Sequence, residues 1–326
     1  MKKEYFKEKF TTDFNDSFPI LNDEPVILHH DFDDGYIDNT FYPFLPGIYV
    51  CLNDVHARNI PMNNNLSDMD LFLINYCIMG RCEFMISDNA FKYVKDNYTS
   101  IGSYTVRDEF FYPSGYYLGF EIFIYKDMFT DETRKTLEIF NIDIDKLSTK
   151  YNNNEKLTLL ETDPNSKKLW FEIYEQKSPD RGLIRLNILK ILHNLLNSDI
   201  TIPANSSYLT RNQARLAKNV QEIISKDISK HISMREISEK YNISETSLKN
   251  YFTAMFGMTV SEYMLNLRMK KAAGLLTESR LPISEIANLC GYSNQGRFAR
   301  IFKNHYGMLP LEYRHNSSTF FSSSCP

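Results

Sequence analysis

A set of polar side chains near the C-terminus has the chemistry needed to read the edges of nucleic-acid bases. The set comprises Thr246, Lys249, Asn250, Gln295, Arg297 and Arg300. Side-chain amides pair bidentately with adenine, and guanidinium groups pair bidentately with guanine. Two further cations, Arg268 and Lys303, suit backbone phosphates, although a structural ion pair is an equal alternative for Arg268.

These side chains can face outward if they lie on helices whose other face is buried. Leu248 and Phe252 are four residues apart, and so are Phe298 and Phe302. Residues at this spacing share one face of a helix, which leaves the polar set on the opposite face. Gly296 falls among the outward positions without a side chain, so we expect one contact to be missing from the second helix.

The two helices belong to two copies of one structural unit. Residues 236–263 and 285–313 repeat the same pattern, at an offset of 49 residues up to the pair Ser244 and Ser293 and of 50 residues after it. A single copy could be an ordinary pair of packed helices. Two copies with the same turn chemistry favour a tandem helix-turn-helix.

In the first copy the sequence predicts a helix over 234–241, a turn at Asn242-Ile243, and a second helix that is capped at Ser244 and ends near residue 256.

In the second copy we predict a helix over 283–290, a turn at Gly291 with positive φ, a cap at Ser293 and a helix that ends at residue 306. An amphipathic helix over 260–276 joins the copies. Its length of roughly 25 Å approaches the repeat of one DNA turn, about 34 Å.

Basic residues are concentrated in the C-terminal part of the chain. Residues 207–326 hold 16 Lys and Arg against 9 Asp and Glu, a net charge of +7. The remaining 206 residues hold 21 against 32, a net charge of −11. The overall charge of −4 hides this separation. A local excess of positive charge is what phosphate neutralisation requires.

A longer signature accompanies the repeats between residues 211 and 315. It comprises Glu236-Ile237-Ser238, Ser244, Phe252, Gly257-Met258, Glu262-Tyr263, Arg268, Ala272, Leu275-Leu276, Pro282-Ile283-Ser284-Glu285-Ile286-Ala287, Gly291-Tyr292-Ser293, Phe298, Phe302-Lys303, Gly307, Pro310 and Tyr313-Arg314. This signature resembles the DNA-binding domain of the AraC/XylS family of bacterial transcription regulators. The resemblance implies two helix-turn-helix units that read adjacent major-groove segments of double-stranded DNA, with the polar set at base-reading positions. We expect a transcription activator, with RNA polymerase as a candidate partner, although the sequence does not distinguish activation from repression.

The N-terminal part of the chain predicts a different domain. Between residues 40 and 125, short runs of Tyr, Phe, Ile and Val are broken by turn pairs such as Pro46-Gly47 and Gly80-Arg81. This spacing is typical of a small antiparallel barrel or sandwich. Helical patterns follow from residue 131. The segment 181–197 is apolar around most of its circumference, so it must be buried on several sides, within its own domain or against a partner.

These patterns predict an α+β fold. We expect a small N-terminal β-barrel or jelly roll with helices in a sensing and dimerisation domain over 1–200, a linker over 197–212, an all-α tandem helix-turn-helix over 211–315, and a disordered tail over 316–326. The domain order resembles that of full-length AraC/XylS regulators, whose N-terminal part is cupin-like. An aromatic-rich barrel favours a small-molecule effector in its cavity, with no ligand residues assigned. We also expect a homodimer formed through the helices of 131–200.

No catalytic, metal or cofactor site is predicted. The seven histidines lack metal-ligand spacing, and the five cysteines include no CxxC pair, which fits a reducing cytoplasm. No run approaches the ~20 apolar residues that span a membrane. We therefore expect a cytoplasmic protein that is not an enzyme. Two alternatives stay open: a cupin-type enzyme, and a DNA-binding regulator controlled by a protein partner or by its expression level, without a small ligand.

Overall fold

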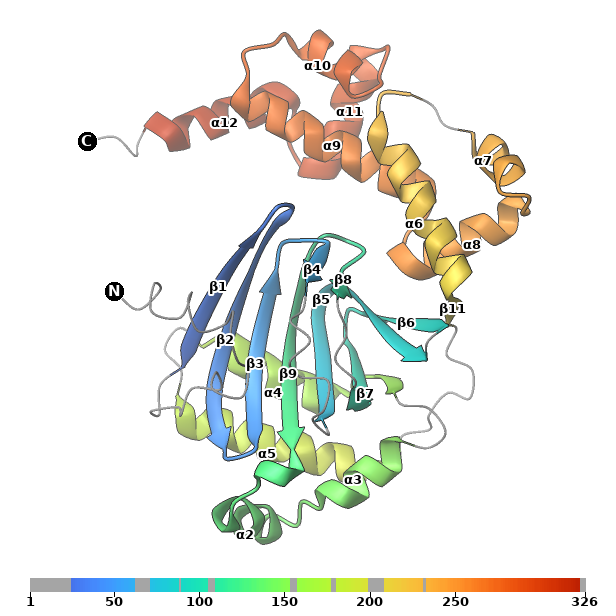
Figure 1. Ribbon diagram of the computed structural model, residues 1–326. Helices are drawn as coiled ribbons and strands as arrows, with labels where there is room; N and C mark the ends of the chain where they lie inside the picture. The colour runs from blue at the N-terminus through green and yellow to red at the C-terminus, as the bar shows by residue number, and fades with distance from the viewer. Residues whose placement is uncertain are drawn as a thin grey trace. The chain divides into compact units, whose positions relative to one another are not determined.

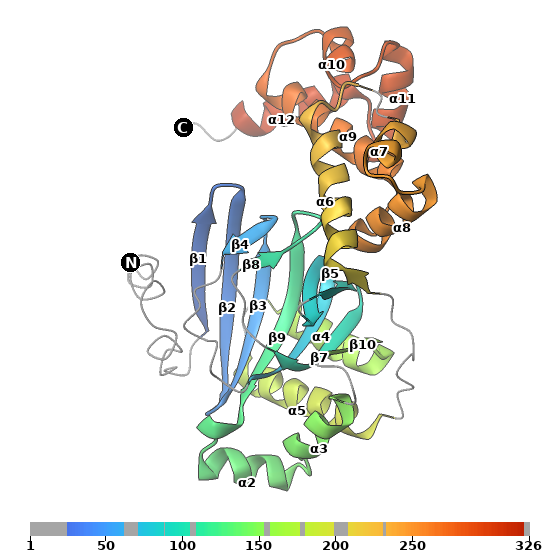
Figure 2. The same ribbon diagram turned by 45° about the vertical axis from the view of Figure 1, so that its right-hand side comes forward.

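The computed structural model describes residues 25–61, 71–87, 89–104, 109–152, 157–176, 180–198, 208–230 and 233–322. The chain divides into two compact units, with the boundary between Arg211 and Asn212 (Figures 1 and 2). In the described ranges, no helix is both long and apolar enough to cross a bilayer.

The first unit contains an antiparallel sheet. Its strands are β1 (Val26–Phe32), β2 (Gly35–Leu45), β3 (Ile48–Val55), β5 (Leu71–Ser87), β6 (Ala90–Lys95), β7 (Tyr98–Tyr104), β9 (Tyr117–Tyr125), β10 (Leu157–Glu161) and β11 (Leu209–Thr210). They pair in the order β1-β2-β3-β9-β5-β6-β11, and β7 pairs with both β5 and β10. Strands β4 (Asn59–Pro61) and β8 (Glu109–Phe111) form a separate short ribbon.

Two features of this sheet differ from the sequence prediction. The strands begin at Val26 rather than near residue 40, because β1 is an edge strand whose polar His29-His30-Asp31 segment lacks an apolar run. Gly80 does not end a strand but bends β5, at φ +95, where a Cβ would lie 2.2 Å from the Tyr116 carbonyl oxygen. Strand β5 pairs with β7 and β9 up to this bend and with β6 beyond it.

Helices cover one face of the sheet. They are α2 (Asp131–Ile139), α3 (Ile144–Tyr151), α4 (Pro164–Tyr174) and α5 (Arg181–Asn197), and the short helix η2 (Lys126–Met128) leads into them. Trp170 of α4 stacks on Tyr76 at 5.6 Å and on Phe120 at 5.1 Å, and it is 1% exposed. One face of α5 packs in the same core with seven buried residues, and the other face is exposed, so the helix is buried on one side rather than on the several sides that the sequence predicted.

The second unit is helical. It contains α6 (Arg211–Lys226), α7 (Met234–Lys240), α8 (Glu245–Phe256), α9 (Val260–Glu278), α10 (Ile283–Leu289), α11 (Gln295–Tyr306) and α12 (Pro310–Ser322). The two copies pack alike. Phe252 and Tyr263 meet edge to face at 5.4 Å and 87°, and Phe302 and Tyr313 do so at 5.4 Å and 85°.

The boundaries of the predicted linker and tail need correction. Helix α12 extends to Ser322, so residues 316–322 are helical rather than disordered, and 323–326 lie outside the described residues. Within the predicted linker, residues 209–210 form β11, which pairs with β6, and α6 starts at Arg211. Residues 199–207 of that linker also lie outside the described ranges.

Candidate nucleic-acid interface and effector site

Each helix-turn-helix unit is held by a local cap and a tight turn. Ser244 accepts a hydrogen bond from the Ser247 amide and begins α8, and Asn294 accepts one from the Arg297 amide and begins α11. The prediction that Ser293 caps α11 is therefore wrong by one residue. Both side chains satisfy amides that the first helical turn leaves unpaired.

The extra residue of the second copy lies in its turn. Gly291 has the predicted positive φ of 81, and Asn242, in the predicted turn of the first copy, occupies the equivalent left-handed position at φ 52. The next residues are also equivalent, because the Ile243 amide binds the Ser238 carbonyl and the Tyr292 amide binds the Ala287 carbonyl. Ser293 is therefore the insertion.

The recognition faces of α8 and α11 have the predicted polarity. Leu248, Phe252, Phe298 and Phe302 are all fully buried. The six predicted base-reading residues are all exposed: Thr246, Lys249, Asn250, Gln295, Arg297 and Arg300. Lys303 is exposed on the same helix as the last three. Each helix therefore presents a continuous polar surface opposite its buried face.

One of these side chains is engaged on its own helix. Lys249 Nζ lies 2.6 Å from Glu245 Oε2, and the two side chains are 51% and 39% exposed. Such a surface pair is worth less than about 1 kcal/mol and is screened by salt. The lysine therefore remains available to a stronger anionic partner.

The prediction that Arg268 contacts phosphate is not supported. Its Nε donates to the Ile228 carbonyl at 2.7 Å and its Nη2 to the Lys230 carbonyl at 3.2 Å. The guanidinium also lies 5.6 Å from the centroid of the Tyr292 ring. Arg268 is thus structural, but its partners are carbonyl groups and a ring rather than the carboxylate of an ion pair.

The two recognition faces differ in charge. At the offset of 50, Ser247, Asn250 and Thr253 correspond to Arg297, Arg300 and Lys303. Helix α8 carries one acid and one base, whereas α11 carries three permanent cations and no acid. Helix α11 therefore has the stronger electrostatic attraction for phosphate.

A row of polar side chains crosses the face of the first unit's sheet that the helices do not cover. The Asn39 amide donates to Asn53 Oδ1 at 2.6 Å, and the Asn53 amide donates to Glu121 Oε2 at 2.7 Å. In the sheet Glu121 is the cross-strand partner of Cys51 on β3 and of Asn75 on β5. Apolar residues of the second core, such as Val55 and Tyr125, share this face.

Burial raises the pKa of Glu121 to about 7, although the hydrogen bond from Asn53 lowers it. Glu121 is half-buried, and a carboxyl group that is removed from water costs stability unless it is well paired, which suggests a functional reason for its presence. Sequence reasoning missed this row. Its signal was the one charged residue within the apolar run from Tyr117 to Tyr125.

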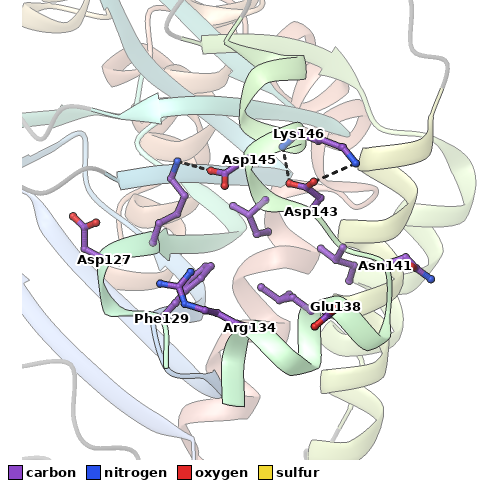
Figure 3. A pocket seen from close by; sticks show the side chains of 12 residues that line it. Asp127, Phe129, Arg134, Glu138, Asn141, Asp143, Asp145 and Lys146 are labelled. Atoms are coloured by element: carbon purple, nitrogen blue, oxygen red, sulfur yellow. Dashed lines mark hydrogen bonds and ion pairs between the residues drawn. The ribbon is translucent and has the colours of Figure 1, made fainter. Parts of the chain in front are cut away.

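A separate hollow of about 750 Å³ lies between η2, α2 and α3 (Figure 3). Charged side chains of both signs line its rim, but two ion pairs already join some of them: Lys126 with Asp145 at 3.0 Å, and Lys146 with Asp143 at 3.3 Å. Over the described ranges, no group of three or more His, Cys, Asp or Glu side chains could hold a metal ion.

Comparison with known proteins concerns part of the chain. A helix-turn-helix domain family matches residues 237–316. The chain is 33% identical over 95 residues to the Msm operon regulatory protein of Streptococcus mutans, covering 29% of this chain and 34% of the relative. It is 32% identical over 104 residues to the transcriptional activator AggR of Escherichia coli, covering 32% of this chain and 37% of the relative.

Among solved structures, the C-terminal domain of the two-component response regulator yesN from Fusobacterium nucleatum is 31% identical, with a TM-score of 0.29, and covers 31% of this chain and 98% of that domain. The chain spans less than two fifths of the length of the two named regulators.

Replacing Glu121 with Gln should change how stability depends on pH. In the native protein the folded chain holds the Glu121 proton up to about pH 7, whereas the unfolded chain releases it near pH 4.5. Folding stability therefore falls as pH rises between these values, by at most about 3 kcal/mol. The Glu121→Gln chain should lack this fall and be more stable at pH 8. Urea unfolding at pH 5 and pH 8 measures the difference, and parallel pH profiles for the two chains would contradict it.

Proposed function

We propose that this chain, whose C-terminal unit belongs to the AraC/XylS family of bacterial transcription regulators, is a sequence-specific DNA-binding activator of transcription controlled by a small molecule. The observation that carries the DNA-binding part is the pair of exposed polar faces on α8 and α11, each opposite a fully buried apolar face. In this proposal Thr246, Lys249, Asn250, Gln295, Arg297 and Arg300 read bases, and Lys303 binds phosphate. The named relatives are an operon regulator and a transcriptional activator, which supports regulation rather than catalysis.

The effector, in our proposal, binds at the polar row of Asn39, Asn53 and Glu121. This row offers hydrogen-bonding groups within an otherwise apolar sheet face, which is the mixture typical of small-molecule sites. The alternative is a regulator controlled by a protein partner or by its expression level. Native mass spectrometry of the purified full chain separates the two, since only the first predicts a bound small molecule that Glu121→Gln releases.

Binding to DNA should depend strongly on salt. The net charge of +7 on residues 207–326 motivates about six to eight phosphate contacts, which correspond to a log–log slope of roughly −5 to −7. Fluorescence anisotropy between 50 and 300 mM salt measures the slope for the full chain and for residues 207–326. A flat response would refute the assignment of this region to the DNA backbone.

The arginines of α11 should set preference at one DNA element only. Arg297→Ala or Arg300→Ala is expected to relax base preference at that element by ~1–3 kcal/mol and to leave the other element unchanged. Selection from a random duplex library with each chain is the measurement. Asn250→Ala is the matched control, because it should affect the other element. Uniform weakening on all sequences would instead assign the arginines to phosphates.

Dimerisation is proposed through the helices of residues 131–200. One face of α5 packs in its own core, whereas Leu183 and Leu186 remain 39% and 43% exposed. Two linked copies on DNA gain affinity because the second binding event is intramolecular. The full chain should sediment as a dimer at micromolar concentration, and Leu183→Glu with Leu186→Glu should yield monomers. A wild-type chain that sediments as a monomer refutes the dimer.

A further inference from the structure

Helix α9 belongs to both helix-turn-helix units. Near its start, Tyr263 contacts Phe252 and Phe256 of α8 at ring distances of 5.4 and 5.2 Å. Further along, Met269, Ala272 and Leu276 are buried with Phe298 and Phe302 of α11. The two recognition helices, α8 and α11, therefore pack against the same helix, α9.

Arg268 lies where α9 passes from one unit to the other. Its two hydrogen bonds reach the loop that precedes the first unit, through the carbonyls of Ile228 and Lys230. Its guanidinium faces the ring of Tyr292, which belongs to the turn of the second unit. One side chain thus touches both units and the helix between them.

The loop that Arg268 binds is itself ordered by Asp227. The carboxylate of Asp227 accepts hydrogen bonds from the amide and hydroxyl of Ser229 and pairs with Lys230 Nζ at 3.1 Å. Hydrogen bonds from Ser229 and Lys230 lower the pKa of Asp227 to about 2, so the carboxylate stays charged at neutral pH. These hydrogen bonds shape the loop that presents the carbonyl acceptors of Arg268.

The same loop lies directly against the second turn. A Cβ on Gly291 would lie 2.6 Å from the Ser229 carbonyl oxygen and 3.1 Å from Arg268 Nη2. No other residue type fits this approach without moving the loop, since the φ of +81 at Gly291 also disfavours a side chain. The contact joins the two units through backbone as well as side chain.

A second arginine makes a similar pair of hydrogen bonds in the other unit. Arg314 of α12 donates to the carbonyls of Leu281 at 2.7 Å and Leu276 at 3.4 Å, in the segment that leads into the second unit. Arg268 makes the corresponding bonds for the first unit. Arg268 in addition faces Tyr292 in the turn of the second unit.

We propose that Arg268, together with Gly291 and the loop at 227–230, is a positioning element that fixes the two recognition helices at one spacing and phase on DNA. This inference rests on the proposed function, because it concerns how two DNA elements are read together. Rigid linkage makes the second binding event nearly intramolecular for elements at the correct spacing and forbids it at others. Arg268 therefore determines spacing specificity without touching a base.

The experiment uses the full chain and a duplex recovered by selection from a random library. Each element is tested alone, together at the selected spacing, and together with about 5 base pairs inserted, which is half a turn. For the wild-type chain we expect the insertion to weaken binding by about 100-fold. For Arg268→Gln the same insertion should weaken binding by less than about 10-fold, with affinity for each isolated element within about 2-fold of wild type.

Three further chains make the result specific. Asp227→Asn loosens the loop without altering α9 and should also reduce the insertion penalty. Arg268→Lys keeps the positive charge and a hydrogen-bond donor, so it should retain part of the insertion penalty that Arg268→Gln loses. Arg314→Gln should weaken binding to the second element alone and keep the full penalty.

An undiminished penalty in both Arg268→Gln and Asp227→Asn overturns the inference. Equal losses on isolated elements and on the joined duplex also overturn it, since they indicate general destabilisation. A wild-type chain that recovers no duplex refutes the proposed function instead.

Discussion

The helical second unit depends on one constraint, which is that helix α9 must pack in two hydrophobic cores at the same time. Its 19 residues extend about 28 Å, and residues near its two ends bury their side chains against α8 and α11 respectively. A change in the direction of α9 would open one core or the other. The placement of every recognition side chain therefore follows from the packing of this one helix and from the contacts of Arg268 beside it.

The basic side chains on α8 and α11 remain accessible to an anionic partner. The basic side chains of α11 are exposed, and Lys249 of α8 is paired only with a neighbour on its own helix surface. Exposed pairs are weak and screened, so exchanging them for phosphate contacts costs little. The half-buried arginines follow a different pattern. Arg268 and Arg314 bind carbonyls at chain segments between helices, where an unpaired carbonyl would otherwise need a donor. Basic side chains of this unit therefore have two roles. Those exposed on the helix surface are available to phosphate, and those beside backbone carbonyls stabilise the fold.

The two faces of the sheet in the first unit differ in polarity. The face covered by α4 and α5 is apolar and closely packed around Trp170. The other face carries Glu121 within a row of amides, and the burial of its carboxyl group raises the pKa to about 7. Such a group weakens the folded state at neutral pH, because the folded chain opposes its ionisation. A polar effector that pairs with the row would reverse that penalty on binding.

The sequence by itself determined the tandem helix-turn-helix, because local signals specify each part. Helix periodicity gave the buried and exposed faces of α8 and α11, and Asn242 and Gly291 marked the left-handed turns. Local signals were insufficient where the outcome depends on distant partners. Ser293 and Asn294 are both good caps, and only the packed turn selects Asn294. From the sequence alone, Gly80-Arg81 resembles a turn between two strands. The pairing of the strands shows instead that β5 continues through Gly80 and changes partner from β9 to β6 there. The roles of Arg268 and Glu121 were decided by the tertiary structure alone, since the carbonyls, rings and amides that surround them come from segments that only folding brings together.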